Sequence, residues 1–223
     1  MSETALTPEQ ITELFSDADG QFRFARWGRP IAPVVFGVDD ATLAPLKDAM
    51  ATVAGIANMK LAETDPELGA NLMVFFCADW AELGHVPNLG KLIPDLAALQ
   101  ATLTRAGANQ YRTFRFDDAG AIRLCVLLLK MDETLAEAPV QALGCGQMTQ
   151  SILLWGEGAF AKNSPIALVR DRGFCIVKPP FAALIRAAYD PGLPGSASDA
   201  SHALRLAARA GLMLKDMNNA API

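Results

Sequence analysis

The segment from residue 111 to residue 130 limits the possible folds more than any other part of the chain. It begins with Tyr-Arg-Thr-Phe-Arg-Phe, in which apolar and polar side chains are interleaved, and it ends with ten residues rich in Ile, Leu and Val. Between the two halves stands Asp-Asp-Ala-Gly, where Gly120 can adopt the positive φ that a tight turn needs. The pattern predicts a β-hairpin.

Other apolar segments predict further strands. Asn71 is followed by a continuous apolar run to Cys77, which is typical of a strand covered on both faces. Residues 30–37 contain two prolines that cannot donate to a β-ladder, so we expect either that this strand lies at a sheet edge or that its pairing is at residues 34–36. A last short strand is expected at residues 173–177.

Apolar periodicity and capping residues predict helices in the remaining segments. A long helix should begin at Pro139 and run through Trp155 to Gly156 or Gly158, and its apolar positions cover more than one face, so we expect it to be central. The other predicted helices are at residues 8–16, 39–58, 94–107, from 180 to about 190, and from 196 or 198 to 214. We therefore predict an α+β fold, with a mixed twisted sheet packed against a long central helix.

The chain is long enough to form one domain with its own core. Of its 223 residues 52% are hydrophobic, and a chain of this length needs no disulfides to hold a core together. Residues 1–20 are interpreted as an N-terminal helical extension, residues 21–215 as a single α+β domain, and residues 216–223 as a flexible tail. The four cysteines, at positions 77, 125, 145 and 175, are dispersed, and we expect them to be reduced and mostly buried.

Charge and hydropathy disfavour several classes of partner. The 19 Lys and Arg residues stand against 24 Asp and Glu residues, and because broad binding to nucleic acid or anionic membrane depends on basic side chains, neither partner is expected. The densest cationic stretch consists of Arg23, Arg26 and Arg29 around Trp27, and we interpret it as a solvated strand edge. No secretory signal or transmembrane segment is recognisable, so we expect a soluble cytoplasmic protein.

Residues for common enzymatic chemistry are sparse and isolated. A zinc hydrolase takes at least two His ligands and a nearby carboxylate, whereas the only histidines here, His85 and His202, are far apart in the sequence. No G-x-S-x-G, dinucleotide-binding or P-loop motif occurs. We therefore expect no catalytic residues, no bound metal and no cofactor.

Three short motifs and the order of the predicted elements resemble a known family. The motifs are Arg26-Trp-Gly-Arg-Pro30, Met148-Thr-Gln150 and Arg186-Ala-Ala-Tyr-Asp-Pro191. Through them the region from Trp27 to Gly195 is similar to a bacterial family of unknown function with a zincin-like fold. The resemblance implies a zincin-like topology and descent from zinc metallopeptidases, in which one helix carries His-Glu-x-x-His.

This chain departs from the zinc-binding pattern that the resemblance implies. Two imidazoles four residues apart share one helix face and reach one ion, while the Glu between them holds the water. The family of unknown function usually has Glu-Glu-x-x-Gln there, and the matching positions here are Gly146, Gln147 and Gln150. Gly146 has no side chain to ligate with, and Gln147 cannot accept a proton from water. We therefore expect no zinc hydrolysis.

A binding function is our first hypothesis. If the ancestral cleft persists as a groove for a protein or peptide, Cys145, Gln147 and Gln150 would line it, and Tyr189 would reach in from the next helix. The simpler interpretation is that the two glutamines are buried amides, hydrogen-bonded to nearby backbone or to an opposing strand. Further alternatives are an enzyme that uses Cys145 as a nucleophile near the start of the helix, and a structural subunit that acts through oligomer formation.

Overall fold

A four-stranded mixed sheet separates two hydrophobic cores. The computed structural model describes residues 4–169 and 174–220. The sheet order is β2-β3-β5-β4; three strands are parallel, β2 (Pro33–Phe36), β3 (Leu72–Cys77) and β5 (Ile122–Lys130), and β4 (Gln110–Phe116) is antiparallel to β5. The α+β class, the hairpin and the edge position of the proline-containing strand are thereby confirmed.

Strand β5 faces a core on both sides. Successive side chains of a strand point to opposite faces of its sheet. The main core contains Cys125, Leu127 and Leu129, and the second core contains Leu124, Val126 and Leu128. The nearly continuous apolar sequence of β5 follows from this double burial.

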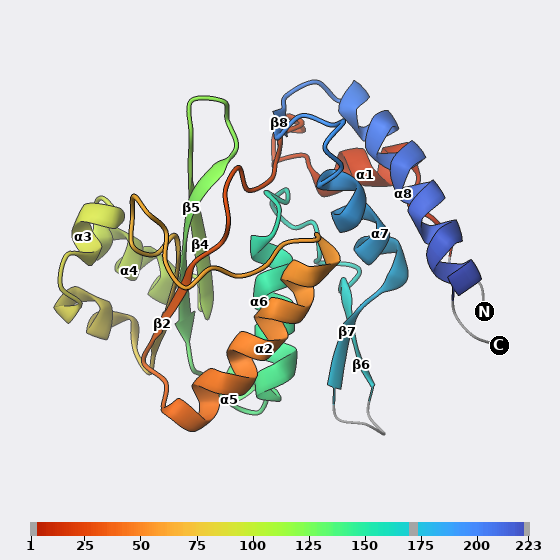
Figure 1. The fold of residues 1–223 in the computed structure, drawn as a ribbon. Coiled ribbons are helices and arrows are strands. Elements are labelled where there is room, and N and C mark those ends of the chain that lie inside the picture. The colour runs from red at the N-terminus through yellow and green to blue at the C-terminus, as the bar shows by residue number, and fades with distance from the viewer. Residues whose placement is uncertain (1–3, 170–173, 221–223) are drawn as a thin grey trace.

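Short helices cover the outer face of the sheet (Figure 1). They are η1 (Trp80–His85), α3 (Leu89–Leu92) and α4 (Leu96–Arg105). Trp80 is buried at the start of η1, and its indole N–H donates to the carbonyl oxygen of Ala108 at 3.1 Å. These helices and the sheet enclose the second core.

Two longer helices cover the inner face of the sheet. They are α2 (Asp40–Ile56) and α6 (Val140–Ser151), the latter preceded by the short α5 (Glu133–Ala136). Gly144 allows the two helices to approach closely, because a Cβ atom there would lie 2.8 Å from the carbonyl oxygen of Leu46. Helix α6 therefore lies in the middle of the molecule, between the sheet and the outer elements (Figure 1).

The N-terminal segment and the C-terminal part of the chain form the outer layer (Figure 1). Its elements are α1 (Pro8–Leu14), β1 (Phe24–Ala25), β6 (Ile166–Val169), β7 (Phe174–Val177), α7 (Pro179–Ala188), β8 (Ser196–Ala197) and α8 (Ser201–Ala220). The strand predicted at residues 173–177 corresponds to β7, with residue 173 outside the described residues, and β6 was not predicted. Helix α1 contributes Ile11 and Leu14 to the main core, and Phe15, directly after the helix, also lies in it.

Helix α8 begins and ends later than the sequence predicted. Its first backbone N–H, that of Ser201, donates to the carboxylate of Asp199 at 2.7 Å, so the helix does not start directly after either predicted serine cap. The predicted tail from residue 216 is wrong as far as Ala220, because Leu214 is buried and Met217 packs against the main core, so the apolar face continues into the next turn. Residues 221–223 lie outside the described residues.

Helix α6 ends at Ser151, although the sequence predicted that it would continue through Trp155. The last carbonyl groups of a helix lack partners within it and need other donors. The indole N–H of Trp27 donates to the carbonyl of Ser151 at 2.8 Å, and the hydroxyl of Tyr189 donates to that of Ile152 at 2.7 Å. Because side chains satisfy these carbonyls, the chain can leave the helix and continue beside β1.

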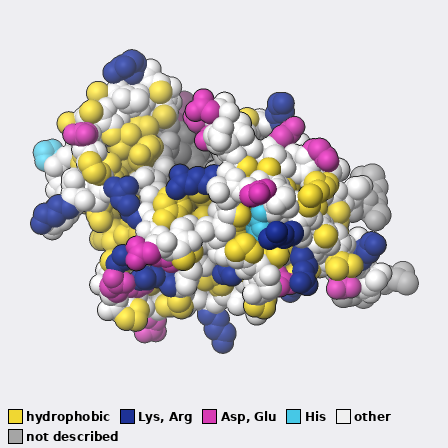
Figure 2. All heavy atoms as spheres, turned by 90° about the horizontal axis from the view of Figure 1, so that it is seen from above, with side chains coloured by type: hydrophobic (Ala, Val, Ile, Leu, Met, Phe, Trp, Pro, Cys, Tyr) yellow, Lys and Arg dark blue, Asp and Glu magenta, His cyan; other side chains and the backbone are white. Residues whose placement is uncertain are grey.

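The surface carries both signs of charge. The three arginines around Trp27 are not one solvated edge: Arg23 and Arg26 each lie over an aromatic ring, and Arg29 forms ion pairs with two carboxylates. On the face shown in Figure 2, basic and acidic side chains are interspersed. None of the helices in the described part of the chain has the length and apolar character needed to cross a bilayer.

Candidate ligand-binding site

Gln147 and Gln150 converge on Arg112, an arginine of β4 that no sequence motif singled out. The Nη2 group of Arg112 donates to Oε1 of Gln147 at 2.7 Å, and its Nη1 group donates to Oε1 of Gln150 at 3.2 Å. Its Nε group donates to the hydroxyl oxygen of Ser151 at 3.0 Å. The three acceptors share one face of α6, because residues three or four apart on a helix are neighbours.

The register of the sheet directs Arg112 toward α6. Arg112 lies opposite Leu127 of β5, whose side chain is in the main core, and directly opposed residues share a face of the sheet. Gln110 lies two residues earlier on β4, and its Oε1 accepts a hydrogen bond from Nε2 of Gln147 at 2.8 Å. Both glutamines of α6 therefore bond to side chains of a facing strand, as the simpler interpretation predicted.

The guanidinium of Arg112 has no acidic partner among the described residues. Their ion pairs join Arg29 to Asp65 and Glu67, Arg123 to Glu67, and Arg209 to Asp190. Burial lowers the pKa of Arg112, but a guanidinium remains protonated at neutral pH. A guanidinium has five N–H groups, and neutral oxygens accept from its three nitrogens here, so two N–H groups remain available.

Arg112 lines a pocket of about 680 Å³ between β4 and the segment that follows α6. Four aromatic side chains also line it, namely Tyr111, Phe114, Trp155 and Phe160. Trp155 stacks on Phe15, with ring centroids 5.1 Å apart and 7° between the ring planes, and it meets Phe160 edge-on at 4.9 Å. The pocket therefore combines a fixed aromatic wall with a positive charge that pairs with no carboxylate of the described residues.

The end of α1 fixes the backbone of that wall. The N–H of Gly156 donates to the carbonyl oxygen of Leu14 at 2.8 Å. A Cβ atom on Gly156 would lie 1.9 Å from the carbonyl oxygen of Ser16, so only glycine fits at this position. Glu157, the acidic residue in the pocket lining, is exposed at the rim and forms no ion pair with any described residue.

Tyr189, which we expected in the same groove, lies elsewhere. Its hydroxyl accepts from the backbone N–H of Trp27 at 3.2 Å and donates to the end of α6. Burial raises its pKa. Its ring lines a separate pocket of about 540 Å³, where the guanidinium of Arg26 lies 5.4 Å from the ring centroid. Tyr189 thus stabilises the end of α6 instead of lining the Arg112 pocket.

Cys145 also lies apart from the two glutamines. Its buried side chain lines a small cavity of about 240 Å³ between α6, α2 and β7. Burial raises the pKa of its thiol to about 12. At neutral pH the thiol is therefore protonated, and a protonated thiol is a weak nucleophile. Of the four predicted site residues, the structure brings together only Gln147 and Gln150.

The sequence did contain a signal for Arg112. In the predicted strand, alternation places Arg112 on the same face as Phe114 and Phe116. A charged residue within an otherwise apolar face requires a polar partner in the interior. The pattern alone could not identify that partner, because it comes from a helix more than 30 residues later in the chain.

A metal site requires several ligating side chains close together. Nowhere in the described ranges do three His, Cys, Asp or Glu side chains lie close enough to share a metal ion. His85 is exposed in η1, and His202 is buried in α8. Comparisons with models of known protein families, with curated proteins and with solved structures find no match to this chain.

Proposed function

We propose that this protein is a non-catalytic protein- or peptide-binding module that takes a carboxylate of its ligand at Arg112. The observation that carries the proposal is a half-buried guanidinium that lines a pocket and is held only by neutral oxygens. A guanidinium presents its N–H groups as a planar fork that matches a carboxylate. A ligand carboxylate would therefore supply the counter-charge that the described residues do not provide.

The surroundings of Arg112 favour a peptide as the ligand. The pocket volume falls within the range of roughly 300–1,000 Å³ that suits a small molecule or a few peptide side chains. Strand β4 forms one edge of the main sheet, and no described strand pairs with its outer side. An extended peptide can add to such an edge through backbone hydrogen bonds, with its side chains in adjacent pockets.

A zincin-like ancestry is part of the same proposal. The positions that would carry the zinc motif hold Gly146, Gln147 and Gln150, and the two glutamines bind Arg112. Amide oxygens are suited to orienting a guanidinium, which has only donors. In this view a helix that once positioned a metal ion positions a charged side chain for recognition. The burial and raised pKa of Cys145 do not favour the alternative of a cysteine nucleophile.

Two matched peptide pools test this function. One pool of random hexapeptides carries a free C-terminal carboxylate, and the other carries a C-terminal amide. Retention on the immobilised full chain should be about tenfold higher for the free acids, since a charge-assisted hydrogen bond contributes roughly 1.5–3 kcal/mol. Enrichment of Asp and Glu among retained amides would indicate recognition of a side-chain carboxylate instead.

Arg112→Gln should abolish the preference for carboxylates. Arg115→Gln is the matched control, because Arg115 lies on the same strand, is exposed and donates to the carbonyl of Leu92. The control should bind like the unaltered chain. Equal retention of acidic and neutral peptides, or unchanged selectivity in Arg112→Gln, would contradict the proposal.

A further inference from the structure

Two of the four cysteines line one cavity. Cys145 of α6 and Cys175 of β7 both line the cavity of about 240 Å³, together with Asp48, Ala49 and Thr52 of α2. All four cysteines are free thiols. The other two, Cys77 of β3 and Cys125 of β5, are buried in the main sheet.

The β6–β7 hairpin directs Cys175 toward α6. In its register Cys175 pairs with Leu168, and Ile166 pairs with Val177, so these four side chains share one face of the hairpin. That face contacts α6, because Cδ1 of Ile166 lies 3.4 Å from the position that a Cβ atom on Gly146 would occupy. The hairpin therefore packs directly against this part of α6.

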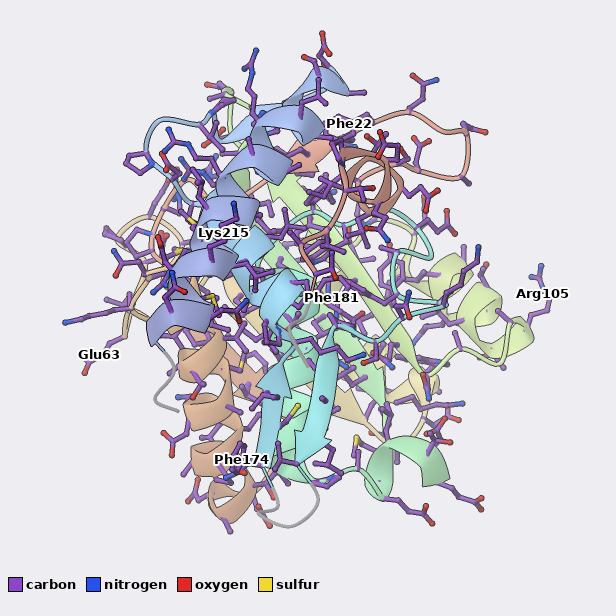
Figure 3. All side chains as sticks on the ribbon, turned by 90° about the vertical axis from the view of Figure 1, so that its right-hand side faces the viewer. Phe22, Glu63, Arg105, Phe174, Phe181 and Lys215 are labelled. Atoms are coloured by element: carbon purple, nitrogen blue, oxygen red, sulfur yellow. The ribbon has the colours of Figure 1, made fainter. Side chains whose placement is uncertain are left out.

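Figure 3 shows the hairpin in front of α6, with Phe174 near its far end. Cys145 directly precedes Gly146, so it lies on the part of α6 that the hairpin contacts. The two thiols line the same cavity, and burial, and then the neighbouring Cys175, raise the pKa of Cys145 to about 12. Burial also raises the pKa of Cys175. A stabilised thiolate would favour the reduced dithiol over the disulfide. Both pKa values are raised here, so neither thiolate is stabilised in this way.

We propose that Cys145 and Cys175 form a reversible disulfide that joins α6 to the β6–β7 hairpin. The oxidant is a small-molecule disulfide. The thiolate of Cys175, the more accessible of the two, attacks one sulfur of the oxidant, whose S–S bond breaks and releases one thiolate. The Cys145 thiol is protonated at neutral pH, so only its small thiolate fraction attacks the sulfur of Cys175 in this mixed disulfide; the attack is slow, but it is intramolecular, and it releases the second thiolate. The two cysteine protons pass to the released thiolates, so the oxidant is reduced to two thiols.

The crosslink would close a loop that contains the segment forming the pocket wall. Cys145 and Cys175 are 30 residues apart, and the residues between them include Trp155 and Phe160. A disulfide restricts the unfolded chain more strongly as the enclosed loop becomes longer. The crosslink should therefore raise the melting temperature by on the order of 5 °C or more.

Glutathione disulfide is the test reagent. The folded full chain is incubated with it, the remaining thiols are blocked with N-ethylmaleimide in denaturant, and the protease digest is analysed by mass spectrometry. The expected product is a Cys145–Cys175 crosslinked peptide, with two blocked thiols per chain instead of four and no retained glutathione. Adding dithiothreitol should restore all four thiols and the original melting temperature.

Matched variants make the result specific. Cys175→Ser should give no crosslink, and this half-buried position tolerates a small polar side chain. Cys77→Ser should still form the crosslink, since Cys77 lies in the main sheet. Stable glutathionylation of Cys175 with Cys145 free, or four unreacted thiols after prolonged incubation, would overturn the proposal. The peptide-retention assay is run on the reduced protein, so its result does not depend on whether the crosslink forms.

Discussion

Two arginines of this protein show opposite solutions to placing a charge beside the main sheet. Arg29 donates to Glu67 at 2.9 Å and to Asp65 at 3.4 Å. Asp65 is buried, and its carboxylate also accepts from two backbone N–H groups and from Asn71. Arg112 is held by two amides and a hydroxyl and meets no carboxylate among the described residues. The first site is complete within the fold, whereas the second has donors left for a ligand.

The largest effect is expected at the complete site. Asn71 is fully buried, accepts from the N–H of Ala32, and donates to the carbonyl of Pro30 and to Asp65. Asn71→Ala removes all three hydrogen bonds and leaves the buried N–H of Ala32 without its acceptor, so it should lower the free energy of unfolding by about 3 kcal/mol. Urea denaturation measures the loss.

Asn109→Ala is the control for that measurement. Asn109 is half-buried and makes one side-chain hydrogen bond, to Asp132 at 2.8 Å. Its loss should cost about 1 kcal/mol. If both variants lose the same free energy, the Asp65–Asn71 network is no more important to the fold than a single peripheral hydrogen bond.

His202 is a polar side chain in the core whose hydrogen-bonding groups, unlike those of Asp65, have no partner among the described residues. Its ring packs against Phe24 with the centroids 4.6 Å apart, and neither ring nitrogen has a hydrogen-bond partner among the described residues. Burial, and then Arg205, lower its pKa, so the folded protein holds the neutral ring. Below about pH 6.5 the unfolded chain binds a proton that the folded chain does not, and stability should fall as the pH decreases from 7 to 5.

The acid sensitivity can be assigned by substitution. His202→Phe should flatten the dependence of the urea midpoint on pH over that interval, while His85→Gln, at an exposed position, should leave it unchanged. A wild-type midpoint that stays constant from pH 7 to pH 5 would show that the buried ring accepts a proton in the folded state without penalty.

The smallest effect on stability is expected at Arg112. Arg112→Gln removes three hydrogen bonds to neutral acceptors but also removes a partly buried charge that has no counter-ion. These contributions oppose each other, so the free energy of unfolding should stay within about 1 kcal/mol of the wild-type value. Thermal or urea unfolding of the variant used in the peptide assay measures this directly. A loss above about 3 kcal/mol would assign Arg112 to the fold and not to recognition.

The sequence predicted correctly those helices and strands whose ends depend on residues close by in the chain. The hairpin around Gly120, with φ of 79°, and the apolar strand after Asn71 belong to this group. The end of α6 could not be predicted, because Trp27 reaches it from 124 residues away in the chain. The candidate site could not be predicted in full for the same reason, because its residues come from segments that are far apart in the chain. Two glutamines were identified on the helix, but the arginine that gives them a role comes from the facing strand.

The contact between Gly156 and the end of α1 has a consequence for any shortened form of this chain. The residues that line the pocket lie within 110–114 and 150–161. Gly156 of this lining contacts Leu14 and Ser16, which lie in the segment that the sequence analysis interpreted as an N-terminal helical extension. Removing the first 20 residues would take away the carbonyl that accepts from Gly156 and the ring on which Trp155 stacks. If Arg112 binds a ligand as proposed, such a fragment should bind it more weakly, because the pocket wall has lost these two contacts.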